Sequence, residues 1–131
     1  MSFSLRKMHR AGVLFFACLC AVPVLAGCEK EATLKPGTYE ATGQGYAEDQ
    51  PIRLSVSIDE SGAIYEIRIL EHHETDEIGA KALDQLTEKA VADNTADVEA
   101  ISGATRTSEG FRDAVRAALE QAKAAAESTE K

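Results

Sequence analysis

Residues 52–58 alternate between apolar and polar side chains, and this pattern limits the fold more than any other part of the chain. The apolar positions are Ile52, Leu54, Val56 and Ile58, and the polar positions between them are Arg53, Ser55 and Ser57. A period of two is that of a β-strand with one face buried and the other in water. Such a strand needs neighbouring strands and a layer that covers its apolar face, so the chain is expected to build a sheet.

The residues around this strand predict its partners. The sequence DESG at 59–62 is typical of a turn, and Tyr65, Ile67 and Ile69 then alternate with Glu66 and Arg68. Together with 52–58 they predict a β-hairpin with one apolar face. The segment 37–46, GTYEATGQGY, is expected to form an earlier strand that its glycines weaken.

Helical spacing replaces the alternation after Thr75, a candidate N-cap. Apolar residues recur at Ile78, Ala82, Leu83, Leu86 and Ala90. This stripe predicts a helix that covers the sheet.

A second helix is expected to start near Ser108, with Phe111, Val115, Ala118, Leu119 and Ala122 on its buried side. After Ala122 the sequence KAAAESTEK has helix propensity and little to bury, so residues 124–131 are expected to be a frayed or disordered tail. The prediction is an α+β fold, a small antiparallel sheet or meander covered by two helices, in a single domain over residues 37–123.

The N-terminal residues are typical of a secretory signal peptide. Arg6, Lys7 and Arg10 precede an apolar run that Pro23 interrupts, and this run is too short for a membrane span. The sequence LAGC at 25–28 resembles the lipobox of bacterial lipoproteins, in which the cysteine is acylated after cleavage. We therefore expect residues 1–27 to be removed and Cys28 to carry the lipid. An ordinary signal cleavage, the alternative, would leave a stray thiol in an oxidising compartment.

Lipid on Cys28 would place the protein on the extracytoplasmic face of the cell membrane. Cys18 and Cys20 lie in the segment expected to be removed, so no disulfide and no cysteine-bound metal is expected in the domain. Residues 28–36 are then a lipidated tether, and the eight residues after the cysteine reach about 25 Å at most. The domain is expected to stay close to the bilayer.

The charge of the chain excludes some partners. Its 14 basic and 22 acidic residues give a formal charge of −8. Removal of Arg6, Lys7 and Arg10 leaves 11 basic residues against the same 22 acidic ones, a formal charge of −11. A domain this acidic is not expected to bind nucleic acid or anionic lipid headgroups.

Small and hydroxyl residues cluster in the sequence AISGATRTSEGF at 100–111, just before the second expected helix. A loop with a helix cap would need no more than this. However, SGATRTS at 102–108 resembles the S-G-A-T-x-T-S signature of FMN-binding domains. Those domains occur in the sodium-pumping NADH:quinone reductase, in the Rnf complex and in small extracytoplasmic lipoproteins. The segments GTYEATGQGY, HHETDEIG and AVRAAL resemble further parts of the family in the same order.

The resemblance implies FMN as the cofactor, joined to Thr105 by a phosphoester bond. A magnesium-dependent flavin transferase makes this bond in the family, with FAD as the donor, and Glu99 falls in the segment that the transferase would recognise. Gly103 and Ala104 would let the backbone approach the phosphate, and the helix N-terminus would direct amides at it. The implied cofactor-binding residues are Ser102, Gly103, Ala104, Thr105, Thr107, Ser108, Glu74, Thr75, Ile78 and Gly79.

The sequence departs from the family pattern in two places. Glu99 stands where an aspartate is usual, and Asp76 and Glu77 stand where proline and glycine are usual. Noncovalent FMN therefore remains an alternative to covalent attachment. A lipoprotein that has kept the fold and lost the flavin is a further alternative.

Other residues give weaker signals. His72 and His73 point to opposite faces if they end a strand, so no metal site is expected there. One histidine is expected in solvent and the other against the flavin or a partner. The chain has no Ser-His-Asp set, no paired-carboxylate site and no dinucleotide fingerprint. Redox chemistry would come from the cofactor alone.

These features predict a membrane-anchored electron carrier rather than an enzyme. It would receive electrons from a membrane quinol or redox complex and pass them to an extracytoplasmic acceptor. The alternative from the enzyme class is a flavin-bearing partner of a separate reductase of the fumarate or urocanate type.

Overall fold

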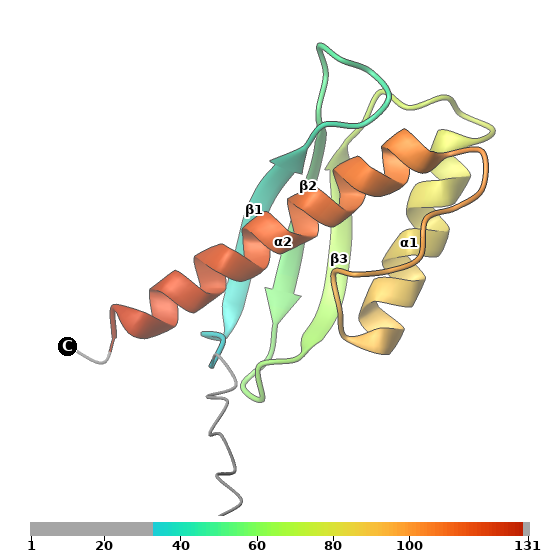
Figure 1. The fold of residues 1–131 in the computed structure, drawn as a ribbon. Coiled ribbons are helices and arrows are strands. Elements are labelled where there is room, and N and C mark those ends of the chain that lie inside the picture. The colour runs from blue at the N-terminus through green and yellow to red at the C-terminus, as the bar shows by residue number, and fades with distance from the viewer. Residues whose placement is uncertain (1–32, 130–131) are drawn as a thin grey trace, which may run out of the picture. The chain divides into compact units, whose positions relative to one another are not determined.

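The computed structural model describes residues 33–129, which form three strands and two helices. The strands are β1 (Gly37–Gly43), β2 (Ile52–Ile58) and β3 (Ile64–Glu71), and they pair antiparallel in the order β1-β2-β3. Figure 1 shows this meander with β2 in the centre. The α+β fold predicted from the sequence is confirmed.

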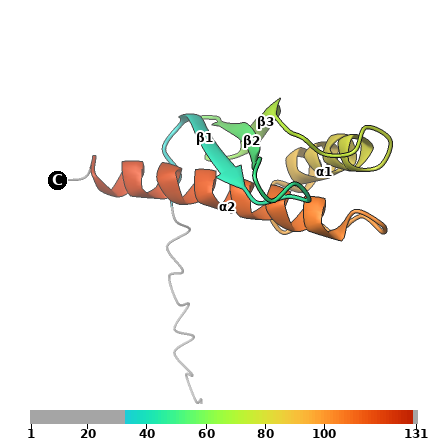
Figure 2. The same cartoon turned by 90° about the horizontal axis from the view of Figure 1, so that it is seen from above.

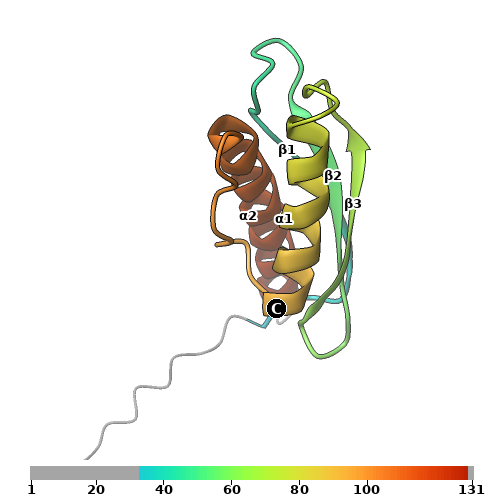
Figure 3. The same ribbon diagram turned by 90° about the vertical axis from the view of Figure 1, so that its right-hand side faces the viewer.

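Both helices cover the same face of the sheet (Figures 1 and 3). Helix α1 (Gly79–Asp93) packs against β3, and α2 (Thr105–Glu127) crosses β1 and β2. Figure 2 looks along the layers and shows α2 lying across the strands. The largest fully buried side chains of the core between the layers are Phe111, Ile52, Leu54, Leu83, Leu86, Val56 and Val115.

The four apolar positions of β2 are buried as predicted, but Ser55 and Ser57 are buried as well, so of the polar positions only Arg53 is in water. The expected partner positions on β3 are also partly wrong. Tyr65 is 58% exposed, and Ile64 is buried in its place. The cause is an irregularity in the pairing: Ser57 pairs with Glu66 and Ile58 with Ile64, so Tyr65 has no partner on β2. A bulged strand places two residues opposite one, which turns the extra side chain out of the apolar face.

Helix α2 is longer at both ends than the sequence predicted. It begins at Thr105 rather than near Ser108, and it continues to Glu127, so residues 124–127 are helical and not a frayed tail. The segment before β1 holds the far end, because the Lys35 N–H donates to the Ala122 carbonyl at 3.2 Å and Lys35 Nζ donates to Thr129 Oγ1 at 3.1 Å. Contacts from a distant segment therefore support a helix end that has no apolar side chain larger than alanine.

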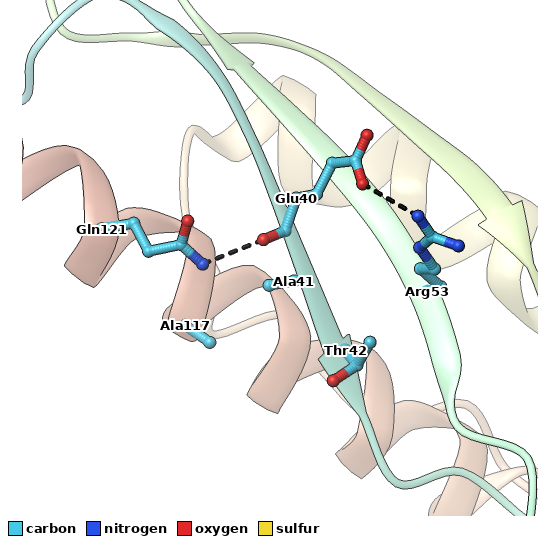
Figure 4. Close-up of a pocket in the computed structure, with 6 residues that line it drawn as sticks. All are labelled: Glu40, Ala41, Thr42, Arg53, Ala117 and Gln121. Atoms are coloured by element: carbon cyan, nitrogen blue, oxygen red, sulfur yellow. Dashed lines mark hydrogen bonds and ion pairs between the residues drawn. The ribbon is translucent and has the colours of Figure 1, made fainter.

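Strand β1 and helix α2 approach so closely that two glycines face each other. A Cβ on Gly110 would lie 2.6 Å from the Gln44 carbonyl oxygen, and one on Gly43 would overlap the Gly110 carbonyl. Further along the same crossing, Gln121 Nε2 donates to the Glu40 carbonyl at 2.9 Å (Figure 4). The helix thus covers the outer edge of β1 and satisfies one of its free backbone groups.

Several expectations fall outside the described residues. These are the signal peptide, the lipidated Cys28 and most of the tether. Within residues 33–129, no helix is both long enough and apolar enough to cross a membrane.

Candidate functional site

A pocket of about 420 Å³ opens at the end of the sheet where three segments meet. They are the β1–β2 loop, the turn between β3 and α1, and the N-terminus of α2, which come together at the upper end of Figure 1. The lining residues are Tyr46, Glu74, Thr75, Ile78, Gly79, Gly103, Ala104, Thr105, Arg106 and Thr107.

The loop before α2 is held by its own hydrogen bonds. Gly103 has φ +84°, a conformation that glycine adopts without strain, and the Ala104 N–H donates to the Ile101 carbonyl at 3.0 Å. The Ser108 hydroxyl is fully buried, donates to the Ala104 carbonyl at 2.8 Å and accepts from the Ile101 N–H at 3.0 Å. Ser108 therefore shapes the loop from inside and does not line the pocket.

Thr105 is exposed and is the first residue of α2. The N-cap position is Ala104, which has no side-chain acceptor, and the first turn holds no acidic residue. The first amides of a helix lack acceptors within the helix and form the positive end of its dipole. This end of α2 is therefore ready to receive an anionic group from outside the chain.

Glu74 closes the back of the pocket and is 6% exposed. Its Oε1 accepts from the Tyr46 N–H at 2.9 Å, and its Oε2 accepts a short hydrogen bond from the buried Thr107 hydroxyl. One side chain thereby joins all three segments of the site. Glycine is needed on both sides, because a Cβ on Gly45 would overlap Oε1 and one on Gly79 would press on the Glu74 Cβ.

Two exposed apolar side chains stand at the mouth of the pocket. Tyr46 is 62% exposed and Ile78 is 57% exposed. Ile78 was expected in the buried stripe of the first helix, and this was wrong, because α1 begins only at Gly79 and Ile78 belongs to the preceding turn. Thr75 still supports the helix entry, since its Oγ1 accepts from the Gly79 N–H at 3.3 Å.

The structure thus brings most of the predicted site residues into one pocket and leaves others outside it. Ser102 and Glu99 are exposed without lining the pocket, and neither His72 nor His73 lines it. His73 lies in a separate hollow, which Glu71 also lines.

Tyr46 and Arg106 line the pocket, and the sequence did not predict them as site residues. Tyr46 was interpreted as part of a strand, but β1 ends at Gly43. Arg106 occupies the variable position of S-G-A-T-x-T-S, where the pattern specifies no side chain. Its guanidinium pairs with Glu48 of the β1–β2 loop at 3.5 Å.

The site residues lie in a part of the chain that matches a known family. Residues 45–120 match the model of the FMN-binding domain. The chain belongs to this family, and its cofactor is FMN.

Two further proteins are similar to the chain. An uncharacterized protein of Treponema pallidum (strain Nichols) is 31% identical over 90 residues, which cover 69% of this chain and 24% of that protein. The chain therefore spans about a quarter of the length of this relative. The crystal structure of the CPE2226 protein from Clostridium perfringens matches 70% of this chain and 91% of its own, with a TM-score of 0.56 and 20% identity. That likeness shows a shared fold.

The residues of the pocket fit the two ends of FMN. The uncapped N-terminus of α2 offers amides to a phosphate, and Gly103 leaves the approach open, because even an added Cβ would have no neighbour within 4 Å. Tyr46 and Ile78 present apolar surface that an isoalloxazine ring would cover.

Proposed function

We propose that the protein is a lipid-anchored extracytoplasmic electron carrier whose FMN is attached to Thr105 by a phosphoester bond. The observation that carries this proposal is the position of Thr105. Its side chain is exposed on the wall of the pocket, at the first residue of a helix that has no cap of its own. A phosphate esterified at this oxygen would sit against the free amides of the same helix turn.

The attachment step balances if FAD is the donor. The Thr105 oxygen forms a bond to the phosphorus of the FMN half, the pyrophosphate bond of FAD breaks, and AMP leaves while the hydroxyl proton passes to solvent. A magnesium-dependent flavin transferase is the partner that this step requires. Glu99 is exposed two residues before Ile101, where an enzyme could reach it.

The residues of the chain hold the cofactor and leave its chemistry to the ring. FMN supplies the uptake and release of electrons when it is bound. The amides at the start of α2 would bind the phosphate and Tyr46 and Ile78 would contact the ring, while Glu74 holds the three walls together. Because the pocket lies at the surface, a quinol or redox complex and an extracytoplasmic acceptor can both approach it.

The membrane location rests on the sequence. The lipobox-like LAGC and the short segment after Cys28 support a domain held near the bilayer by acyl chains. A domain of this charge has no electrostatic attraction to an anionic membrane, so the anchor would supply the binding.

The test is the intact mass of residues 29–131 after co-expression with a flavin transferase, recorded under denaturing conditions. The expected gain is the mass of FMN minus one water, and Thr105→Val abolishes it. Thr42→Val is the matched control, because Thr42 is an exposed threonine that does not line this pocket. The control should keep the full gain.

Two results would contradict the proposal in different ways. A yellow protein without a mass gain would show that FMN binds without a covalent bond. A colourless protein of unchanged mass would show that the loop serves only as a helix start.

A further inference from the structure

Glu74 differs from every other acidic residue in the described part of the chain. It is the only buried side chain among residues 33–129 that can carry a charge. Burial of a carboxylate costs free energy unless hydrogen bonds compensate. Two donors do so here, the Tyr46 N–H and the Thr107 hydroxyl.

None of the ion pairs within residues 33–129 includes Glu74. Its hydrogen-bond partners are neutral groups, which stabilise the charge without cancelling it. The cation that lines the same pocket, Arg106, is paired with Glu48, and both of these side chains are largely in solvent. Solvent screens that pair much more strongly than it screens a carboxylate at the back of the pocket.

The chain also fixes where this charge lies. A Cβ on Gly45 would overlap Glu74 Oε1 and one on Gly79 would lie 2.5 Å from the Glu74 Cβ, so a larger residue at either position would displace the Glu74 side chain. A charge that is held in place and shielded from water acts strongly on its surroundings, because the effective dielectric constant is low there. Glu74 lines the pocket, so its charge acts on a group bound there.

We infer that Glu74 lowers the reduction potential of the flavin in this pocket. The inference rests on the proposed placement of FMN between Thr105 and Glu74. Full reduction of a flavin at neutral pH takes two electrons from the reductant and one proton from the buffer, so one negative charge is added. A fixed carboxylate in the pocket wall opposes that added charge, and the oxidised form is favoured.

The test is the midpoint potential of the flavin in the full chain, measured by dithionite titration against reference dyes. In Glu74→Gln the amide oxygen can accept from the Tyr46 N–H while its NH₂ donates to Thr107, so the hydrogen bonds remain and the charge is lost. The potential should become more positive, with an increase on the order of tenfold in the equilibrium constant for reduction. Glu88→Gln, on α1 and away from the pocket, is the control for lost charge and should leave the potential unchanged.

A second variant separates charge from geometry and does not depend on the first. Thr107→Val removes one hydrogen-bond donor and leaves the carboxylate in place, so the flavin potential in this variant should stay the same or become more negative. If the substitutions acted by loosening the site, the flavin potential would shift in the same direction in both variants. A more positive potential in Thr107→Val, or equal potentials in the wild type and Glu74→Gln, would overturn the inference.

The wild-type spectrum separates this inference from the proposed function. If the wild type holds no flavin, the proposed function fails before any potential is measured. If it holds FMN and Glu74 does not affect the potential, only the role of Glu74 fails.

Discussion

The site depends on a few close contacts of the Glu74 side chain. Its two oxygens hold the β1–β2 loop and the first turn of α2, and the absence of a side chain at Gly45 makes room for one of them. Glycine here serves close approach and not an unusual backbone angle, since Gly45 is not among the positive-φ residues. The flavin site and the folded state therefore share the same contacts.

Gly45→Ala is expected to reduce both stability and flavin content. The new methyl group would displace the Glu74 carboxylate, and overpacking of this kind costs about 1–3 kcal/mol. Urea unfolding and the ratio of flavin to protein absorbance measure the two effects. Gly62→Ala is the control in the β2–β3 turn, where φ is +84° and the cost is backbone strain of about 1–2 kcal/mol. It should lower stability and leave the flavin content unchanged, and the same flavin content in both variants would contradict this account.

Individual residues were predictable where a motif specifies them. Thr105 and Glu74 belong to segments that resemble the family pattern, and both line the pocket. Tyr46 was missed because its role depends on where β1 ends. Ile78 was assigned to the wrong environment, because a turn before α1 interrupts the periodic pattern that includes it.

At the scale of elements, the meander is set by alternation and the helix ends are set by tertiary contacts. Strand β2 follows the sequence pattern at its four apolar positions, but Ser55 and Ser57 are buried too, because a central strand has neighbours on both sides. Strand β3 departs from it at Tyr65, because a bulge depends on pairing with the neighbouring strand. The extension of α2 to Glu127 depends on Lys35, which lies far away in the sequence. Neither the irregular pairing of β3 with β2 nor the contact between Lys35 and α2 can be predicted from the residues of the element alone.

Asn94 shows how one cap joins two elements. It ends α1 in the left-handed conformation, with φ 52° and ψ 47°, and its Oδ1 accepts from the Ile64 N–H of β3 at 2.7 Å. Asn94→Gly should cost about 1 kcal/mol for the lost hydrogen bond, since glycine accepts the backbone angle. Asn94→Ala should cost about 1–2 kcal/mol more, because its Cβ is strained there. Equal free energies of unfolding for the two variants in urea would contradict this explanation.

At the scale of the whole molecule, a small acidic domain is expected to act close to a membrane that its charge does not attract. The formal charge of −8 for the full chain would become more negative with removal of the proposed signal peptide, which holds Arg6, Lys7 and Arg10. Acyl chains on Cys28, as proposed, would bind by burying methylene groups, about 0.8 kcal/mol for each.

Cys28→Ser is expected to move the protein from the membrane fraction to the soluble fraction of the cells that produce it. The wild type should resist a wash with concentrated salt and be released by detergent, because the anchor is apolar and salt weakens only charge interactions. Immunoblots of the fractions measure the distribution. A Cys28→Ser variant that remains on the membrane would show that another segment or a partner holds the protein there.

The central claim is that the flavin is bonded to Thr105 at the start of α2. Peptide mapping tests it most directly: the flavin-loaded protein is digested with trypsin, and the fluorescent peptide is sequenced by tandem mass spectrometry. Cleavage after Lys89 and Arg106 yields residues 90–106, and the added mass of FMN minus water should lie on Thr105. The same mass on Ser102 or Thr107, or a flavin that leaves every peptide unmodified, would contradict the claim.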